Sequence, residues 1–318
     1  MEVNLEIGKS AVESHKDLRL VRCYFWYIYI NDLNLASGLE VNLFADDAYL
    51  STSSKSSQEL ENTMNAELRK ISNWLLKNKL SINTSKTTYM ITSNQKTNHC
   101  FKLYVQGKEL YETKEAKYLG LVIDNKLTWN KHTNNVRNRL ASGCWALHKM
   151  KRILSQDSLK MVYFGLIYQT LQYCISCWGG AAPCHLKPLD VLNKRAIRTI
   201  CGAHRNEHTT PLFHKLGILK LNDLYVWQIG KIMHKISNSS WNGTYDFTKV
   251  NDVHKYPTRF SQQNNYHRGT MELKMTDRAL TIAGPDIWSK IPAEIKSLPF
   301  NSFKKSYKKY LIEKYKTS

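Results

Sequence analysis

The spacing of apolar residues changes once along this 318-residue chain, close to Asp124. Before that point, short runs rich in strand-forming residues surround a single helical stretch, and after it apolar residues recur every three or four positions. Strands are predicted at residues 41–50, 87–92, 101–105 and 118–123. The sequence therefore predicts an α+β part followed by a helical part.

Helices are predicted in both parts. In the first, Ser56 and Glu59 have the spacing of a capping box. The helix that they open has one apolar face and should end near Asn78; the face comprises Leu60, Met64, Leu68, Ile71 and Leu75. In the second, helices are predicted near residues 136–150, 159–171, 186–200 and 303–315.

The positive charge is unevenly distributed. The formal net charge is +20, yet residues 1–110 hold 13 Lys and Arg against 12 Asp and Glu. Residues 111–318 hold 33 against 14, an excess of 19. A basic excess in one region favours a polyanionic partner such as nucleic acid, because neutralised phosphates release counterions. The alternative is a solvated basic surface that keeps the protein soluble.

The remaining composition excludes several classes of protein. Seven scattered cysteines do not form a disulfide framework. The first residues include Glu2 and Glu6 without an apolar run, so no signal peptide is expected. Residues 161–178 are uncharged, but Gln169 and Gln172 interrupt them and no membrane span is expected. We expect a soluble, intracellular protein, with the nucleus as one possible location.

Two acidic residues, Asp46 and Asp47, stand between two strand-forming runs and should occupy the turn of a β-hairpin. Adjacent carboxylates supply the hard oxygen ligands that suit Mg²⁺. Two-metal phosphoryl transfer needs such ligands to hold two ions about 4 Å apart. By itself, an acidic pair in a turn is more often explained by turn chemistry and solvation.

A series of motifs in order gives the acidic pair a context. The series comprises Phe44-Ala45-Asp46-Asp47, the capped helix with Trp74-Leu75, Asn83-x-x-Lys86-Thr87, Tyr118 to Asp124, and Leu127-Thr128-Trp129. It resembles the palm of non-LTR retrotransposon reverse transcriptases, and similarity to the helical region that follows extends the resemblance over roughly residues 24–316. The resemblance implies an RNA-directed DNA polymerase fold with a partial palm and a helical thumb. It further implies that Asp46 and Asp47 are catalytic and bind Mg²⁺, and that Lys86 protonates the pyrophosphate leaving group.

The chain also departs from that family. There, a first catalytic aspartate lies on an upstream strand, followed by a Gln-Gly-Ser-type loop and a helix. Here residues 23–33 match only the end of that helix, Asp17 has no apolar strand before it, and residues 1–22 show no clear element. We therefore expect the fingers and the first metal-binding strand to be missing, and the chain to be a catalytically incomplete fragment. The alternatives are a non-catalytic basic nucleic-acid-binding protein derived from it and, less favoured, an interaction scaffold.

The predicted organisation has four parts. Residues 1–22 are unassigned, 23–124 form a partial palm, 125–236 a helical thumb with the following region, and 237–318 a connector with a basic C-terminal region. RNA or an RNA–DNA duplex is the expected partner, and the oligomeric state is left open. The candidate phosphate contacts, which could equally be solvated side chains, are Arg195, Arg198, Lys304, Lys305, Lys308 and Lys309.

Two weaker candidates remain. Cys174 and Cys177, with Cys184-His185 downstream, have the spacing of half a zinc site, although buried small apolar residues explain them better. Four tryptophans could stack on bases, but at helical spacing such residues are more typical of a core. They are Trp129, Trp145, Trp178 and Trp288.

Overall fold

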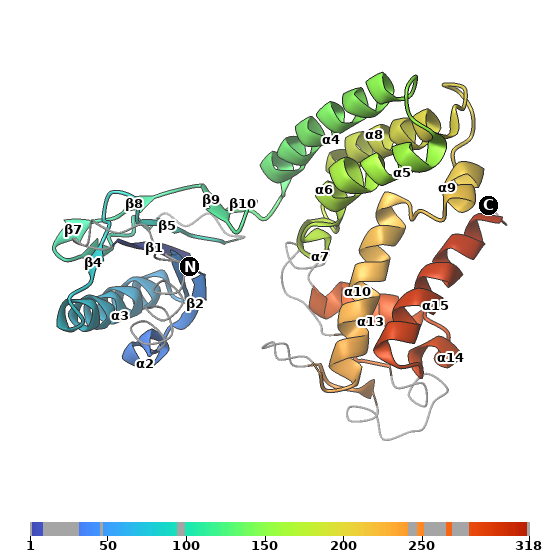
Figure 1. Ribbon diagram of the computed structural model, residues 1–318. Helices are drawn as coiled ribbons and strands as arrows, with labels where there is room; N and C mark the ends of the chain where they lie inside the picture. The colour runs from blue at the N-terminus through green and yellow to red at the C-terminus, as the bar shows by residue number, and fades with distance from the viewer. Residues whose placement is uncertain are drawn as a thin grey trace. The chain divides into compact units, whose positions relative to one another are not determined.

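The computed structural model describes residues 2–8, 32–44, 47–93, 99–240, 247–250, 265–268 and 280–316. The chain divides into two compact units, Met1–Leu127 and Thr128–Ser318. Strands and two helices make up the described part of the first unit, and the described part of the second is almost entirely helical (Figure 1). The predicted α+β and helical character is thus confirmed, with the change of character close to Asp124.

The first unit contains a six-stranded sheet. Its order is β2 (Glu40–Phe44), β3 (Asp47–Ser51), β1 (Glu2–Gly8), β5 (Thr88–Met90) and β8 (Tyr111–Glu112), and β4 (Ser81–Ile82) pairs with β1. Strands β2 and β3 are antiparallel, and Phe44 is the partner of Asp47. Only residues 45 and 46 separate these partners, so the predicted hairpin is confirmed.

Strand β1 corrects the expectation for the start of the chain. No element was predicted for residues 1–22, yet residues 2–8 pair antiparallel with both β3 and β5. The signal was present, because polar and apolar residues alternate from Glu2 to Ile7 with the period of a strand. A strand therefore lies beside the hairpin, where the sequence analysis expected the first strand of the palm to be missing.

Helix α3 (Ser57–Lys77) covers one face of the sheet (Figure 1). Ser56 Oγ accepts the hydrogen bond of the Glu59 N–H at 3.4 Å, as a capping residue should. The Glu59 carboxylate does not complete the box; it accepts a hydrogen bond from Ser54 Oγ at 2.6 Å. The apolar face is buried as predicted, and it packs with α2 (Leu33–Ala36) and with alternate residues of β3 in one core.

Two short ladders complete this unit, β6 (Tyr104–Val105) with β7 (Lys108–Glu109) and β9 (Glu115–Tyr118) with β10 (Leu121–Asp124). A single strand over residues 118–123 was predicted, and this was wrong. Leu119 and Gly120 both have positive φ, 46° and 82°. Two consecutive positive φ values reverse the chain in a two-residue hairpin turn, so the run becomes a turn and a second strand.

The second unit is a helical array. Its elements are α4 (Asn130–Met150), α5 (Gln156–Tyr163), a π-helical turn (Phe164–Tyr168), α6 (Gln169–Gln172), α7 (Ile175–Trp178), α8 (Pro183–Cys201), α9 (Thr210–Leu216), α10 (Leu221–Ser237), α13 (Leu280–Ser289), α14 (Ala293–Lys296), α15 (Phe300–Glu313) and a 3₁₀ turn (Lys314–Lys316). All four predicted helical stretches lie within these elements. Helix α4 packs along α8, and α10 packs against α13 and α15 (Figure 1). No helix in the described ranges is both long and apolar enough to span a membrane.

The tryptophans divide between core and surface. Trp178 and Trp288 are at most 1% exposed, whereas Trp145 is 65% exposed and Trp129 is partly buried. The core interpretation therefore holds for two of the four. Helices α10 and α15 also approach each other closely. A Cβ added at Gly230 of α10 would overlap the ring of Tyr307 on α15.

Candidate functional site

The acidic hairpin places Asp47 at the first position of β3. Asp46 lies outside the described residues. Along β3, Ala48 and Leu50 are buried in the core under α3, while Asp47 and Tyr49 are only partly buried. Successive side chains of a strand point to opposite faces. Asp47 and Tyr49 therefore lie on the face of the sheet away from α3.

A second hairpin contacts that face. Tyr49 Oη donates a hydrogen bond to the carbonyl oxygen of Lys117 at 3.1 Å. The rings of Tyr49 and Tyr118 meet edge to face with their centroids 3.9 Å apart. The β9–β10 hairpin is thus held against β3 two residues after Asp47.

The motif around Lys86 forms a tight turn between β4 and β5. The N–H groups of Lys86 and Thr87 both donate to the carbonyl oxygen of Asn83, at 3.1 Å. The Thr87 hydroxyl donates to the same oxygen at 2.9 Å and its residue is fully buried, which anchors the turn. Lys86 is exposed.

Strand register locates this turn relative to the acidic hairpin. On one side of β1, Glu6 is the partner of Asp47. On the other side, β1 pairs with β4 through Ile7 and with β5 through Asn4. The loop that contains Lys86 joins β4 to β5, so it lies next to residue 6 of β1. Neighbouring strands lie about 4.8 Å apart, so the backbone of this loop is roughly 10 Å from that of Asp47. The fold thus brings two of the predicted catalytic residues to one region of the sheet.

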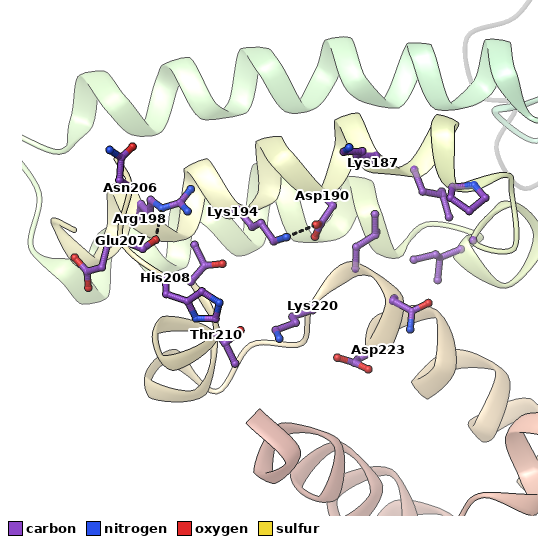
Figure 2. A pocket seen from close by; sticks show the side chains of 17 residues that line it. Lys187, Asp190, Lys194, Arg198, Asn206, Glu207, His208, Thr210, Lys220 and Asp223 are labelled. Carbon is purple, nitrogen blue, oxygen red and sulfur yellow. Dashed lines mark hydrogen bonds and ion pairs between the residues drawn. The ribbon is translucent and has the colours of Figure 1, made fainter. Parts of the chain in front are cut away.

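The two candidate arginines lie on α8 and differ in their surroundings. Arg195 is exposed. Arg198 Nε donates to the carbonyl oxygen of Glu207 at 2.9 Å and fastens the loop after α8 (Figure 2). Arg198 also lines a pocket of about 590 Å³, where Lys194 and Asp190 form an ion pair at 2.6 Å. Arg198 therefore has a structural role that sequence alone did not indicate.

The four candidate lysines of α15 fall into two pairs. Lys305 and Lys309 are exposed, and Lys309 forms an ion pair with Glu313 at 3.8 Å. Lys304 and Lys308 are half-buried. Each pair has the i, i+4 spacing that places two side chains on one side of a helix. All four were predicted together as phosphate contacts, and in the structure they lie in two different environments.

Three further lysines near Lys304 and Lys308 were missed. Lys231 and Lys235 lie on α10, and Lys160 lies on α5; all three are half-buried. The available signal was weak, because each stands alone among apolar residues in its helix and only the packing of the three helices brings them near α15.

Comparison with known proteins bears on the resemblance. Residues 23–123 match the model of the family described as reverse transcriptase (RNA-dependent DNA polymerase). The RNA-directed DNA polymerase from mobile element jockey of Drosophila funebris is 28% identical over 203 residues, which is 63% of this chain. The chain is related to the reverse transcriptases of non-LTR retrotransposons. The resemblance predicted from the motifs is thereby confirmed.

Other relatives of this chain agree. The probable RNA-directed DNA polymerase from transposon X-element of Drosophila melanogaster is 24% identical over 204 residues, covering 60% of this chain and 21% of the relative. The Pol polyprotein from type-1 retrotransposable element R1 2 of Nasonia vitripennis is 24% identical over 168 residues, covering 48% and 40%. The chain spans about a fifth of the length of its Drosophila relatives, 22% for jockey of Drosophila funebris. No solved structure matches it.

The similarity to reverse transcriptases implies Mg²⁺, so the side chains that could act as metal ligands are informative. Within the described residues, no three His, Cys, Asp or Glu side chains lie together where they could hold a metal ion. Asp47 is one of the described residues, and Asp46 is not. The described side chains therefore do not fit Mg²⁺ by themselves, and no reaction step follows from them.

The possible zinc half-site gains no support from the same comparison. Cys174, Cys177, Cys184 and His185 all lie in the described part of the chain, and they do not form a metal-binding group there. The alternative, that the cysteines are buried apolar residues, was wrong for Cys177 and Cys184, which are both exposed.

Proposed function

We propose that this chain binds RNA and RNA–DNA duplexes through its helical unit, and that these 318 residues alone do not extend a primer. The observation that carries the proposal is where the charge lies. Residues 1–127 hold 16 Lys and Arg against 15 Asp and Glu, whereas residues 128–318 hold 30 against 11. All but one unit of the excess of 20 positive charges therefore falls in the second compact unit. A unit with a net charge of +19 attracts phosphate backbones irrespective of base sequence.

Relatedness to RNA-directed DNA polymerases supports nucleic acid as the polyanion. Template recognition and metal-dependent chemistry are separable tasks, because phosphate contacts need only positioned cations whereas phosphoryl transfer needs a complete carboxylate set. The chain has cations in abundance and, among its described side chains, lacks an assembled carboxylate set. Asp46, Asp47 and Lys86 stay predicted catalytic residues of the intact enzyme.

One observation favours a second candidate, retained polymerase activity. Strand β1 lies beside β3, and its acidic residue Glu6 is in register with Asp47. Catalysis by these 318 residues would then depend on Glu6, and substitutions at both positions separate the two candidates.

Salt dependence tests the binding proposal. We expect the full chain to bind a short RNA–DNA duplex with an affinity that falls linearly on logarithmic axes as salt rises. Five phosphate contacts give a slope of about −3.5 to −4.5, which is roughly two orders of magnitude in affinity between 50 and 200 mM salt. Fluorescence anisotropy with labelled duplexes of unrelated sequence measures both the slope and the lack of sequence preference.

An unrelated protein of equal size and net charge is the control for nonspecific attraction. A slope near zero, or an affinity no higher than that of the control protein, contradicts nucleic-acid binding and favours an interaction scaffold.

A further inference from the structure

Helices α10 and α15 are joined at a tryptophan that also contacts a lysine. Trp227 Nε1 donates a hydrogen bond to the carbonyl oxygen of Lys304 at 3.1 Å. The Nζ atom of Lys231 lies 3.9 Å from the centroid of the same ring. Lys235, one turn further along α10, lies over Phe300 of α15 at 5.2 Å. Three lysines therefore gather where the two helices meet.

These lysines are close enough to repel one another. Burial, reinforced by the charges of Lys304 and Lys235, lowers the pKa of Lys231 to about 8. Burial likewise lowers the pKa of Lys308, and the charge of Lys160 on α5 adds to the effect. Both shifts disfavour the charged lysine, which is the opposite of what a nearby carboxylate would do.

Lys304, near Lys231 and Lys235, and Lys308, near Lys160, lie one turn apart on the same side of α15. They therefore connect the lysines of α10 with the lysine of α5. We call the five residues the lysine row: Lys160, Lys231, Lys235, Lys304 and Lys308. No ion pair joins any of them to an acidic residue in the described part of the chain. Half-buried cations without counterions are costly, whereas lysines on an ordinary solvated face extend into water.

We propose that the lysine row is the phosphate-binding surface of the helical unit, on which the sugar–phosphate backbone of RNA or of an RNA–DNA duplex lies. This inference rests on the proposed function and names the site. Phosphates would supply the counterions that the described acidic residues do not provide. Cations packed against aromatic rings are already positioned, so less side-chain entropy is lost when a phosphate binds.

An acidic membrane surface is the competing source of phosphate. Peripheral membrane helices place large apolar side chains beside their lysines. Of the large apolar side chains that are exposed in the described ranges, none lies on α10 or α15, which hold four of the five lysines, and one, Met161, lies on α5 beside Lys160. The surface of these two helices therefore suits a nucleic-acid backbone better than a lipid headgroup layer.

Two double variants of α15 test the proposal with matched charge and spacing. Lys304→Gln with Lys308→Gln removes two members of the row, and Lys305→Gln with Lys309→Gln removes two exposed lysines of the same helix. With the full chain and an RNA–DNA duplex, the first variant should flatten the salt slope by roughly 1.4–1.8. The second should leave the slope unchanged. Glutamine retains much of the apolar stem, and circular dichroism verifies the fold.

A third variant, Lys160→Gln, tests the row from a different helix and should flatten the slope by roughly 0.7–0.9. The proposal for the lysine row is overturned if the unmutated chain shows the expected salt slope and both double variants have equal slopes. The proposed function would then still stand. A flat slope for the unmutated chain removes both. Binding to phosphatidylserine vesicles that needs Lys304 and Lys308, while duplex binding does not, also overturns the proposal.

Discussion

Primer extension by the purified chain is expected to be undetectable with Mg²⁺ or Mn²⁺, a primed RNA template and all four dNTPs. Two-metal phosphoryl transfer depends on carboxylates that position two cations, and charge stabilisation accounts for nearly all of its rate. The resemblance places one such carboxylate on a strand upstream of the Asp46–Asp47 hairpin, and the matching strand motif and Gln-Gly-Ser-type loop are not found in these 318 residues.

The expected loss is large. Removing one electrostatic contact from a transition state commonly costs about 3–4 kcal/mol, or 10²–10³ in rate. A displaced template and nucleotide lower the rate further, because a misplacement of about 1 Å alone can lower the rate 10²-fold. Activity should therefore fall at least two to three orders of magnitude below that of a complete reverse transcriptase assayed on the same primed template.

Extension that Asp47→Asn abolishes would contradict this expectation. Glu6→Gln then shows whether strand β1 supplies the additional carboxylate, since Glu6 is the register partner of Asp47. Glu2→Gln on the same strand is the control, because its partners are Ser51 and Met90, away from the acidic turn.

Replacement of Trp288 by alanine should destabilise the helical unit by about 3–5 kcal/mol. Trp288 is 1% exposed, and its ring centroid lies 6.2 Å from that of Phe303 and 6.3 Å from that of His234. These rings bring α10, α13 and α15 together, so a cavity there loosens the three helices jointly. Urea denaturation followed by far-ultraviolet circular dichroism measures the shift in the helical transition.

Trp145→Ala is the matched control on the surface. Its ring is 65% exposed, with Lys149 Nζ 5.5 Å from its centroid, so stability should change by no more than about 0.5 kcal/mol. If Trp288→Ala left the unfolding midpoint unchanged but abolished RNA binding, Trp288 would stack on bases and the core interpretation would be wrong.

Local patterns were sufficient for much of the fold. The spacing of Leu60, Met64 and Leu68 predicted α3, because an apolar stripe is a property of a short stretch of chain. The strand-forming runs around Asp46 and Asp47 likewise predicted the β2–β3 hairpin. Strand β1 was not predicted although its alternation was readable, because its pairing with β3 and β5 is not contained in a seven-residue pattern.

The candidate site depended on contacts that a local pattern does not contain. Lys304 and Lys305 are adjacent and identical in the sequence, but only Lys304 approaches Lys231. Trp227, 77 residues before Lys304, donates a hydrogen bond to the Lys304 carbonyl oxygen. Arg198 was predicted as a phosphate contact, and only the structure shows that its Nε also donates to the Glu207 carbonyl oxygen. Charge therefore predicted the partner class, and tertiary packing was needed to select residues.

Lysine footprinting of the full chain tests the central claim most directly. An amine-reactive reagent is applied with and without a saturating RNA–DNA duplex at low salt, and mass spectrometry reports the labelling of each lysine. We predict that the duplex protects the lysine row, while Lys305 and Lys309 on the same helix keep their reactivity. Protection confined to the first unit, or no protection at all while the duplex is bound, would contradict the account.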